Sequence, residues 1–252
     1  MIDLHTHLLP GVDDGAASLD EALPVLERFA AEGVTVVVCT PHLDASAAAD
    51  APVEAHAALH ATLAARAPAG LTLRTGWEIQ LDVPNADLTA TELHLGGSTA
   101  ALVEFAGMAV PPNAARELYR LRRSGVVPVL AHPERYRGAT VQLVEEWRGA
   151  GAVTQVDAGL LFGRAPMCRL ARALLQQGLV DCLASDNHAD GRSLAVARRW
   201  LEELGAAEPA RLLTETNPAR LLRNEGTLPV DPIPEADAGV LARLRSLITG
   251  RP

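Results

Sequence analysis

Short apolar runs rich in β-branched residues recur along the chain, and each run ends in polar residues. Runs of this length, bounded by polar or turn residues, are typical of buried strands. The pattern predicts seven strands, at Ile2–His7, Val34–Thr40, Leu71–Ile79, Ala100–Phe105, Val126–His132, Ala152–Asp157 and Leu179–Ser185.

Most segments between these runs place apolar residues at helical spacing. They predict helices at Leu19–Ala31, Val53–Ala67, Asn113–Ser124, Thr140–Gly149, Ala165–Gln177 and Leu194–Leu204. Ser18 is the expected N-cap of the first helix, with Glu21 completing a capping box. Several helices are followed by a glycine, which a left-handed C-cap favours, namely Gly33, Gly125, Gly151 and Gly178.

Strands that alternate with helices imply parallel pairing and an α/β fold. Seven such units within 252 residues predict one distorted (β/α)7 TIM-like barrel. We place this domain at residues 1–228, because the chain near that point becomes rich in proline and acid, in GTLPVDPIPEADAG. Residues 229–252 are expected to form a tail that includes a short amphipathic helix at Val240–Ile248.

Composition narrows the classes of function. The formal net charge of −9 gives no broad attraction to nucleic acid or to an anionic membrane, and no apolar run reaches membrane-spanning length. The chain has no lysine, which excludes a Schiff-base lysine and a P-loop lysine. Cys39, Cys168 and Cys182 lack CxxC spacing and are expected to be core thiols in a reducing compartment. No secretory leader is recognisable, so we expect a cytoplasmic protein that neither binds nucleic acid nor inserts into a membrane.

Histidines and carboxylates stand at the ends of the predicted strands. They are His5, His7, His42, Glu78, Glu104, His132, Asp186 and His188, in the motifs HTH, TPH, GWEI, VEF, AHPER and SDNH. The carboxyl ends of parallel strands open onto one mouth of a barrel, so these side chains should converge there. Asp13 and Asp14, in the first loop, can reach the same place. Burying so many ionisable groups without an ion is unfavourable, and imidazole with carboxylate suits divalent metals; the set therefore predicts a metal site.

Other polar residues fit simpler roles. His56 and His60 lie four apart on a predicted helix, but Ala57 stands where HExxH needs glutamate, so we expect a surface helix. His94 is expected in a solvated loop, and Asp157 ends the sixth strand without an assigned role. No cysteine is followed by arginine six residues later, as a thiol-dependent phosphatase loop requires, and GxSxG, Walker A and GxGxxG motifs are absent.

The motifs HTH, DDG, TPH, GWEI, VEF, AHPERY and SDNH resemble, in order and spacing, the PHP superfamily of metallo-phosphoesterases. More closely, the chain resembles the bacterial manganese-dependent tyrosine-protein phosphatases that accompany capsule and exopolysaccharide tyrosine kinases. The likeness runs from Met1 to about Leu228 and includes TNPARLLRNEGTL. It implies a distorted seven-stranded barrel that holds three divalent metal ions, manganese first, with iron, zinc and cobalt left open.

The resemblance also divides the expected ligands among the three metals. The first would be held by His5, His7, Glu78 and Asp186, the second by Glu78, Glu104 and His132 with Glu78 as the bridge, and the third by Asp14, His42 and His188.

Two arginines are marked by the resemblance as phosphate-binding residues of the catalytic site. They are Arg135, in PERY, and Arg192, in DGR. A planar guanidinium suits phosphate oxygens, which supports this role. The chain departs from many relatives at Leu43, where they carry a second histidine, and in the short alanine-rich segment DASAAADAP.

The implied reaction is hydrolysis of phosphotyrosine by a hydroxide that bridges the metals. The implied partner is a tyrosine-phosphorylated protein, a bacterial tyrosine autokinase, and the implied process is regulation of capsule or exopolysaccharide synthesis. Two alternatives stay open. One is a PHP phosphatase for a small ester such as histidinol phosphate, and the other is a non-enzymatic module that binds a partner protein.

Overall fold

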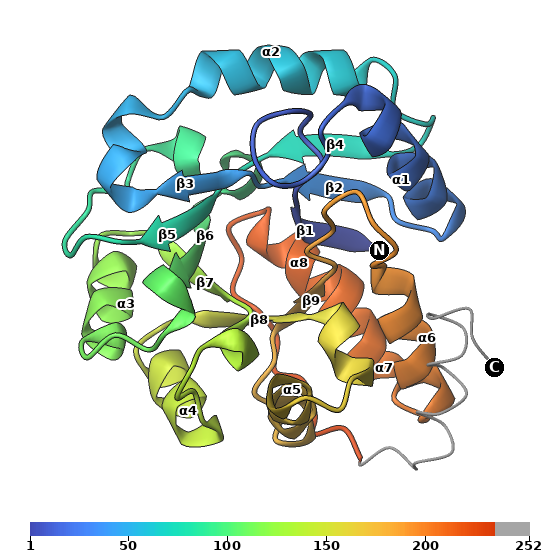
Figure 1. Cartoon of the computed structure of the whole chain (residues 1–252). Coiled ribbons are helices and arrows are strands. Elements are labelled where there is room, and N and C mark those ends of the chain that lie inside the picture. The colour runs from blue at the N-terminus through green and yellow to red at the C-terminus, as the bar shows by residue number, and fades with distance from the viewer. Residues whose placement is uncertain (235–252) are drawn as a thin grey trace.

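Strands and helices alternate along the chain in a computed structural model that describes residues 1–234 (Figure 1). The strands are β1 Ile2–Thr6, β2 Val36–Cys39, β3 His42–Asp44, β4 Thr72–Thr75, β5 Glu78–Leu81, β6 Ala100–Phe105, β7 Val127–Ala131, β8 Val153–Asp157 and β9 Cys182–Ala184. The helices are α1 Leu19–Ala31, α2 Val53–Ala64, α3 Ala114–Arg123, α4 Val141–Gly149, α5 Pro166–Gln176, α6 Leu194–Glu203, α7 Ala207–Arg211 and α8 Asn217–Leu221. Shorter helical turns are η1 Ala45–Asp50, η2 Thr91–Leu93, η3 Leu95–Gly97, η4 Ala106–Met108, η5 Pro133–Arg135, η6 Ala158–Phe162 and η7 Leu212–Thr216.

The strands form two parallel sheets, in the orders β1-β2-β4 and β3-β5-β6-β7-β8-β9. The predicted parallel α/β class is therefore confirmed. Within residues 1–234 these strands do not form one closed sheet, so the TIM-like barrel stays a prediction. The sheets are adjacent where β1 meets the segment after β9, because Asp186 N donates to His5 O at 2.9 Å and His7 N donates to Asn187 O at 2.8 Å.

One predicted strand, Leu71–Ile79, is wrong as a single element. The structure divides it into β4 and β5, and β3 follows β2 after a matching break. Pro41 lies at the first break and has no N–H to donate to a neighbouring strand. Gly76 lies at the second, where an added Cβ would come within 3.0 Å of the Leu95 side chain. Both breaks bend the strands at the same level, so the first sheet ends where the second begins.

Helix ends follow the sequence in part. The four glycines predicted as C-caps all have positive φ. The capping box predicted for α1 is wrong in detail: Ser18 takes the N-cap position without a side-chain hydrogen bond, and Glu21 accepts from Ala17 N at 3.0 Å.

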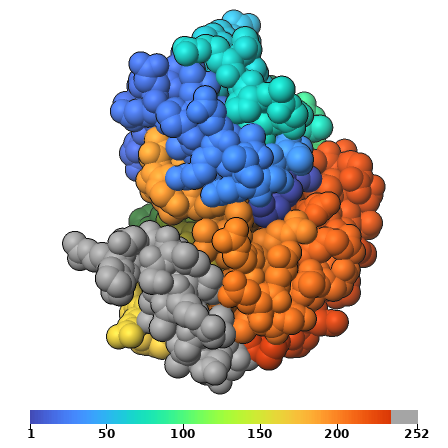
Figure 2. Space-filling view, turned by 90° about the vertical axis from the view of Figure 1, so that its right-hand side faces the viewer, coloured from blue at the N-terminus to red at the C-terminus, as the bar shows by residue number. Residues whose placement is uncertain are grey.

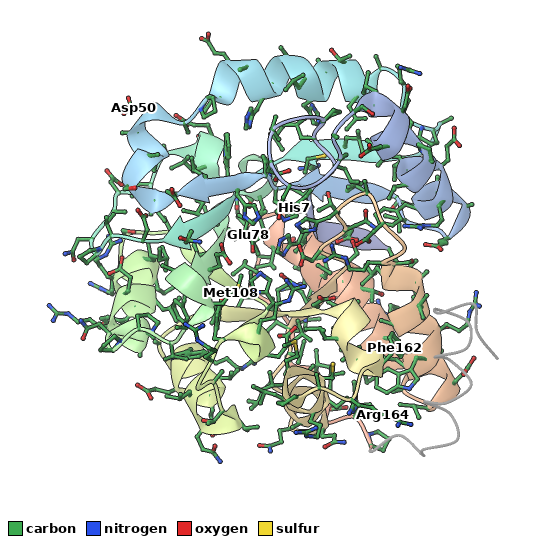
Figure 3. All side chains as sticks on the ribbon, in the orientation of Figure 1. His7, Asp50, Glu78, Met108, Phe162 and Arg164 are labelled. Carbon is green, nitrogen blue, oxygen red and sulfur yellow. The ribbon has the colours of Figure 1, made fainter. Side chains whose placement is uncertain are left out.

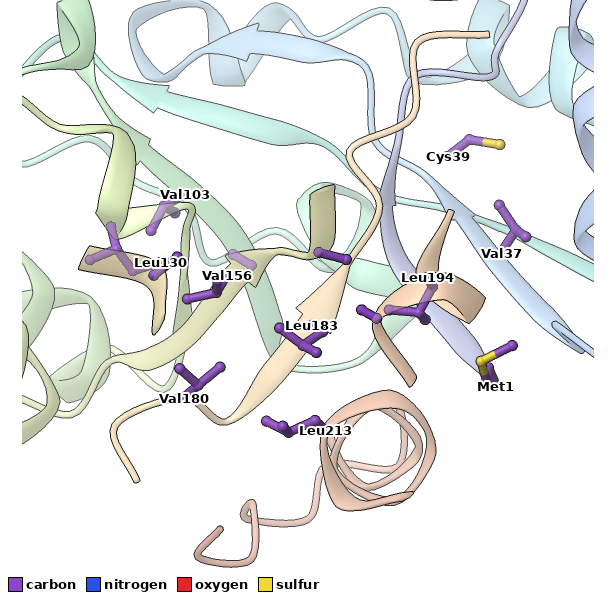
Figure 4. Close-up of a cluster of buried hydrophobic side chains, with 14 of the residues drawn as sticks. Met1, Val37, Cys39, Val103, Leu130, Val156, Val180, Leu183, Leu194 and Leu213 are labelled. Atoms are coloured by element: carbon purple, nitrogen blue, oxygen red, sulfur yellow. The ribbon is translucent and has the colours of Figure 1, made fainter. Parts of the chain in front are cut away.

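Apolar side chains from neighbouring strands fill the interior, and Val103, Leu130, Val156 and Leu183 are fully buried in one cluster (Figure 4). The helices lie around the outside of the strands, with α1 and α2 on one side and α3 to α6 around the others (Figure 1). Figure 2 shows the N-terminal part of the chain, in blue and cyan, packed directly over the C-terminal part, in orange.

The start of the predicted tail packs on the domain. Val230 and Ile233 are buried, and Ile233 N donates to Leu175 O at 3.1 Å. The helix predicted at Val240–Ile248 lies outside the described residues. In residues 1–234, no helix combines the length and apolar character needed to cross a membrane.

We predict that Leu183→Ala lowers the free energy of unfolding by about 2–5 kcal/mol, because it removes a fully buried side chain from a packed cluster. The matched control is Leu59→Ala on α2, where 36% of the residue is exposed. Chemical denaturation of both variants measures the difference. Equal losses in the two variants would contradict the packing described.

Candidate metal centre

The nine predicted metal ligands lie together. Seven of them lie near the carboxyl ends of strands or in the loops that follow, but His42 and Glu78, which were expected to follow or end strands, are the first residues of β3 and β5. Both stand just after the two breaks in the strands. Figure 3 shows two of them, His7 and Glu78, close together near the middle of the molecule. The nitrogen and oxygen atoms that could bind an ion fall into overlapping groups, and within each group they lie within 4.8 Å of one another. The groups are His7–Asp14–His42–His188, His5–Glu78–His132, His5–His7–Asp186 and His42–Glu78–Glu104.

His5 and His7 form the most deeply buried part of the centre. His5 lies on β1 and His7 is the residue directly after its end, two positions on, so both side chains project to the same face, and both residues are fully buried. Their Nε2 atoms are 3.1 Å apart. Oδ1 of Asp186 lies 3.2 Å from Nε2 of His5 and 3.3 Å from that of His7, and Oε2 of Glu78 lies 3.3 Å from each. Two imidazoles and two carboxylates thus face one point.

Glu78 lies between the groups. Its Oε1 is 2.6 Å from Nε2 of His132, and its Oε2 is 3.1 Å from Nδ1 of His42. Glu104 is more distant, at 3.9 Å from His132 and 4.0 Å from His42. Its Oε2 is buried without a hydrogen-bond partner, while Gln80 donates to its Oε1 at 3.2 Å. A buried carboxylate oxygen without a donor is unfavourable, and a bound cation would satisfy it.

The outer group is open to solvent. Oδ1 of Asp14 lies 3.3 Å from Nε2 of His42 and 3.4 Å from Nε2 of His188. The side chain of Asp14 is 70% exposed and that of His42 is 41% exposed. The ring of His188 stacks on that of His7 at 4.1 Å, which connects this group to the buried one. An ion held here would be the one most accessible from outside.

Two further side chains orient the histidines of β1. Oδ2 of Asp13 lies 2.7 Å from Nδ1 of His7, and Oε1 of Gln155 lies 2.9 Å from Nδ1 of His5. Each partner occupies Nδ1 and leaves Nε2 to face the centre, as is common for metal-ligating histidines. Asp13 was expected near the centre, whereas Gln155 was missed. Its signal in the sequence is one polar amide inside the fully buried run VTQVD of β8.

The pKa values of the histidines and carboxylates in the centre are shifted because their opposite charges compensate each other. Burial alone would lower the pKa of His5, but the carboxylates of Glu78 and Asp186 raise it to about 9. Burial alone would raise the pKa of Glu78, but His5 and His132 hold it well below its usual range. The pKa of Glu104 is raised by burial and by the charge of Glu78. Without metal, protonated histidines thus supply the positive charge that metal cations would supply when bound.

Backbone strain is found at two of the nine residues. His132 has φ of 33° and Asp186 has φ of 49°, both in the left-handed region that non-glycine residues rarely adopt. Such conformations are unfavourable by about 1–3 kcal/mol and persist where the surroundings demand them. His132 directly follows β7 and Asp186 lies two residues after β9, and the left-handed turn sets the direction in which each side chain leaves the strand end.

The two arginines expected to bind phosphate lie beside the buried group. Arg135 Nη2 is 2.5 Å from Asp186 Oδ2 and also donates to Asp157. Arg192 Nη1 donates to the same Asp186 oxygen at 3.1 Å, and its Nε donates to Asp190 at 2.8 Å. Asp157, which sequence reasoning left without a role, therefore anchors Arg135. Both guanidinium groups are about one-quarter exposed, at 24% and 27%.

The remaining candidates lie elsewhere. The prediction that His94 is solvated is wrong: it is buried, and its ring nitrogens are 2.9 Å from Ser98 O and 2.8 Å from Leu88 O. Both partners are backbone carbonyls, and a sequence pattern does not predict which carbonyls will lie beside a side chain. His56 and His60 lie half-buried on α2, as expected of a surface helix.

The expected core location of the thiols is confirmed for Cys39, Cys168 and Cys182, which are all free and buried. Burial raises the pKa of Cys39 to about 12. A thiol in that state is a poor nucleophile, so the centre's chemistry does not depend on it.

The donor set fits divalent cations. It consists of imidazole nitrogens and carboxylate oxygens without thiolate, which suits manganese, iron, cobalt and zinc. The unpartnered oxygen of Glu104 and the convergence on Glu78 are the observations that fit a cluster of such ions.

Sequence comparison connects this geometry with known proteins. Residues 1–223 match the family model described as capsular polysaccharide synthesis, CpsB/CapC. Tyrosine-protein phosphatase YwqE of Bacillus subtilis (strain 168) is 29% identical over 245 residues, which cover 89% of this chain and 92% of YwqE. Tyrosine-protein phosphatase CpsB of Streptococcus pneumoniae is 28% identical over 242 residues, which cover 89% of this chain and 99% of CpsB.

Structure comparison gives the same relatives. A crystal structure from work on YwqE of Bacillus subtilis and CpsB of Streptococcus pneumoniae, described as metal-dependent tyrosine phosphatases, aligns with a TM-score of 0.78 at 27% identity. The alignment covers 94% of this chain and 100% of that one. Dihydropyrimidinase from Brevibacillus agri NCHU1002 aligns with a TM-score of 0.53 at 14% identity, covering 92% of this chain and 73% of that one, and shares the fold alone.

We predict that metal uptake releases protons and tightens as pH rises toward 9. With its pKa at about 9, His5 carries a proton near neutral pH, and an ion must displace that proton to bind. Calorimetric titration of metal-stripped protein with Mn²⁺ between about pH 6 and pH 8, in buffers of different ionisation enthalpy, measures the affinity and the proton release. His60→Gln, outside the centre, should leave the profile unchanged. An affinity independent of pH would contradict the assignment.

Proposed function

Because the chain belongs to the CpsB/CapC family of capsular polysaccharide synthesis, we propose that it is a metal-dependent protein-tyrosine phosphatase. The observation that carries the proposal is the gathering of nine candidate metal ligands beside two arginines, both of which contact the carboxylate of one of those ligands, Asp186. Relatives that match almost the whole chain are named tyrosine-protein phosphatases, which supports the same activity. The reaction is hydrolysis of a phosphoric monoester.

The centre would hold three divalent ions, manganese first. Such ions lower the pKa of water toward neutrality and offset negative charge on a phosphoryl group. The proposed ligands are His5, His7, Glu78 and Asp186 for one ion, Glu78, Glu104 and His132 for a second, and Asp14, His42 and His188 for the third. Asp13 and Gln155 hold the histidines of β1 in the orientation that binding needs.

Arg135 and Arg192 would bind the phosphoryl oxygens. Each guanidinium also contacts a second carboxylate, Asp157 or Asp190, so its direction is set before substrate arrives. Planar N–H donors can contact two phosphate oxygens at once and stabilise the charge that develops during transfer. A tyrosine leaving group has a pKa of about 10, so it needs less protonation than an alkyl alcohol would.

The finer parts of the assignment belong to the same proposal. The substrate would be a tyrosine-phosphorylated protein of capsule or exopolysaccharide synthesis, a tyrosine autokinase, in the cytoplasm. Residues 1–228 would act as one distorted seven-stranded barrel, with 229–252 as its tail. The backbone bonds between β1 and the segment after β9 support this architecture, because they bring the first and last strands together.

We predict that metal-stripped protein is inactive and that added Mn²⁺ restores hydrolysis of a phosphotyrosine peptide, with Zn²⁺ and Fe²⁺ tested beside it. The reason is that no nucleophile of the chain replaces water activated by a cation. Phosphate release is measured with histidinol phosphate run in parallel. A clear preference for the small ester, or no activity with any metal, would contradict the proposed substrate while leaving the metal centre intact.

We predict opposite results for two substitutions. Cys39→Ser keeps phosphotyrosine hydrolysis, because the buried thiol, with its pKa of about 12, takes no part. Asp186→Asn loses at least the ~10–100-fold that changes around metal ligands typically produce, because it removes a charge shared by His5, His7 and both arginines. Steady-state kinetics and thermal unfolding are measured together. A large loss of phosphotyrosine hydrolysis in Cys39→Ser, without unfolding, would contradict a mechanism that needs no thiol.

A further inference from the structure

A cavity of about 480 Å³ lies beside the metal centre, and two of its lining residues are Arg135 and Arg192. Its apolar lining residues are Leu160 and Phe162 from η6 and Val196 from α6. We infer that this cavity binds the phenyl ring of phosphotyrosine while the arginines hold the phosphate, an inference that rests on the proposed function. In this role the apolar lining of the cavity selects aryl over alkyl phosphates.

The cavity is continuous with the centre through the arginines. Both line the cavity, and both contact Oδ2 of Asp186, whose Oδ1 lies 3.2 Å from Nε2 of His5. A phosphate held between these guanidinium groups is therefore adjacent to the ligand atoms. In the inferred pose, the group bonded to that phosphate extends into the cavity toward η6 and α6, and it passes the carboxylates of Asp157 and Asp190, which also line the cavity.

The apolar wall is firmly placed. The ring of Phe162 is buried and packs edge-on against Trp200, with centroids 5.7 Å apart. Figure 3 places Phe162 on the side of α6, away from His7 and Glu78. Gly159, in η6, donates its N–H to Asp157 Oδ1 at 2.7 Å, and Asp157 also accepts from Arg135. The wall and the phosphate-binding donors are thus connected through Asp157.

Size and chemistry fit an aromatic ring. Pockets that bind small ligands usually measure about 300–1,000 Å³ and combine apolar walls with a few convergent polar groups. Leu160 and Val196 are half-buried, so each still presents apolar surface to a ligand. A phenyl ring would cover this surface, whereas the short alkyl arm of phosphoserine would leave it in contact with water.

The test compares benzylphosphonate with methylphosphonate, which share the anionic head and differ in the ring. Binding to the Mn²⁺-loaded full chain is measured by calorimetry. We expect benzylphosphonate to bind at least about tenfold more tightly, equivalent to about 1.4 kcal/mol. The double variant Leu160→Asn/Val196→Thr keeps side-chain size close to that of the original and should bring this ratio close to one, with the affinity for methylphosphonate unchanged.

The matched control is Leu59→Asn, the same exchange at an exposed leucine of α2, which should keep the tenfold ratio. Thermal unfolding checks that the double variant is folded, and the single variants Leu160→Asn and Val196→Thr replace it if it is not. A ratio that stays near tenfold in the variants would overturn the assignment of the cavity. So would a ratio near one in the unsubstituted protein.

Hydrolysis of phosphotyrosine and phosphoserine peptides by the same proteins separates this inference from the proposed function. The double variant should show a higher KM for phosphotyrosine with kcat little changed. If the unsubstituted protein hydrolyses neither peptide but keeps its preference for benzylphosphonate, the function fails and the ring site stands. If it hydrolyses phosphotyrosine and the variants keep both KM and the binding ratio, the ring site fails alone.

Discussion

Compensation of buried negative charge at Glu78 is the constraint on which the centre of this protein depends. The carboxylate is almost fully buried, and four imidazoles approach its two oxygens within 2.6–3.3 Å. They come from the end of β1, the start of β3 and the residue after β7. An isolated buried carboxylate would be strongly unfavourable, so the surrounding cations are a requirement of folding as well as of chemistry. Protonated histidines meet this requirement without metal, and divalent ions meet it when they bind.

The same constraint explains the neighbouring features. β1 brings His5 and His7 to the centre and also lies beside the segment after β9, which carries Asp186. Asp186 in turn contacts both histidines and both arginines. A single carboxylate thus connects the metal-binding side chains with the phosphate-binding ones, and the cavity beside the arginines extends that connection to the rest of a substrate.

Much of the fold and of the candidate metal centre could be predicted from the sequence, because short patterns along the chain indicate the helices and strands and the polar residues beside them. Helical spacing located α1 to α6 to within a few residues, although it missed the short helices α7 and α8. The polar residues that flank the apolar runs included all the candidate ligands. The misses have a common cause. Each depends on how the chain folds in three dimensions. The break of one strand at Gly76 and the amide of Gln155 beside His5 involve residues distant in the chain. The carbonyl partners of His94, on Leu88 and Ser98, are close in sequence, but the path of the loop places them. The sequence shows a polar residue, Gln155, inside β8, but it does not show that His5 is its partner.

The sequence alone determined which residue types stand at strand ends, and alternation along β1 determined that His5 and His7 share a face. Tertiary structure alone decided that Glu78 would be the shared carboxylate, that Asp157 would anchor Arg135, and that an apolar cavity would adjoin the arginines. The physical reason is that local periodicity sets the direction of a side chain relative to its own strand. Distances between atoms of different strands are set by how the strands pack, pair and bend.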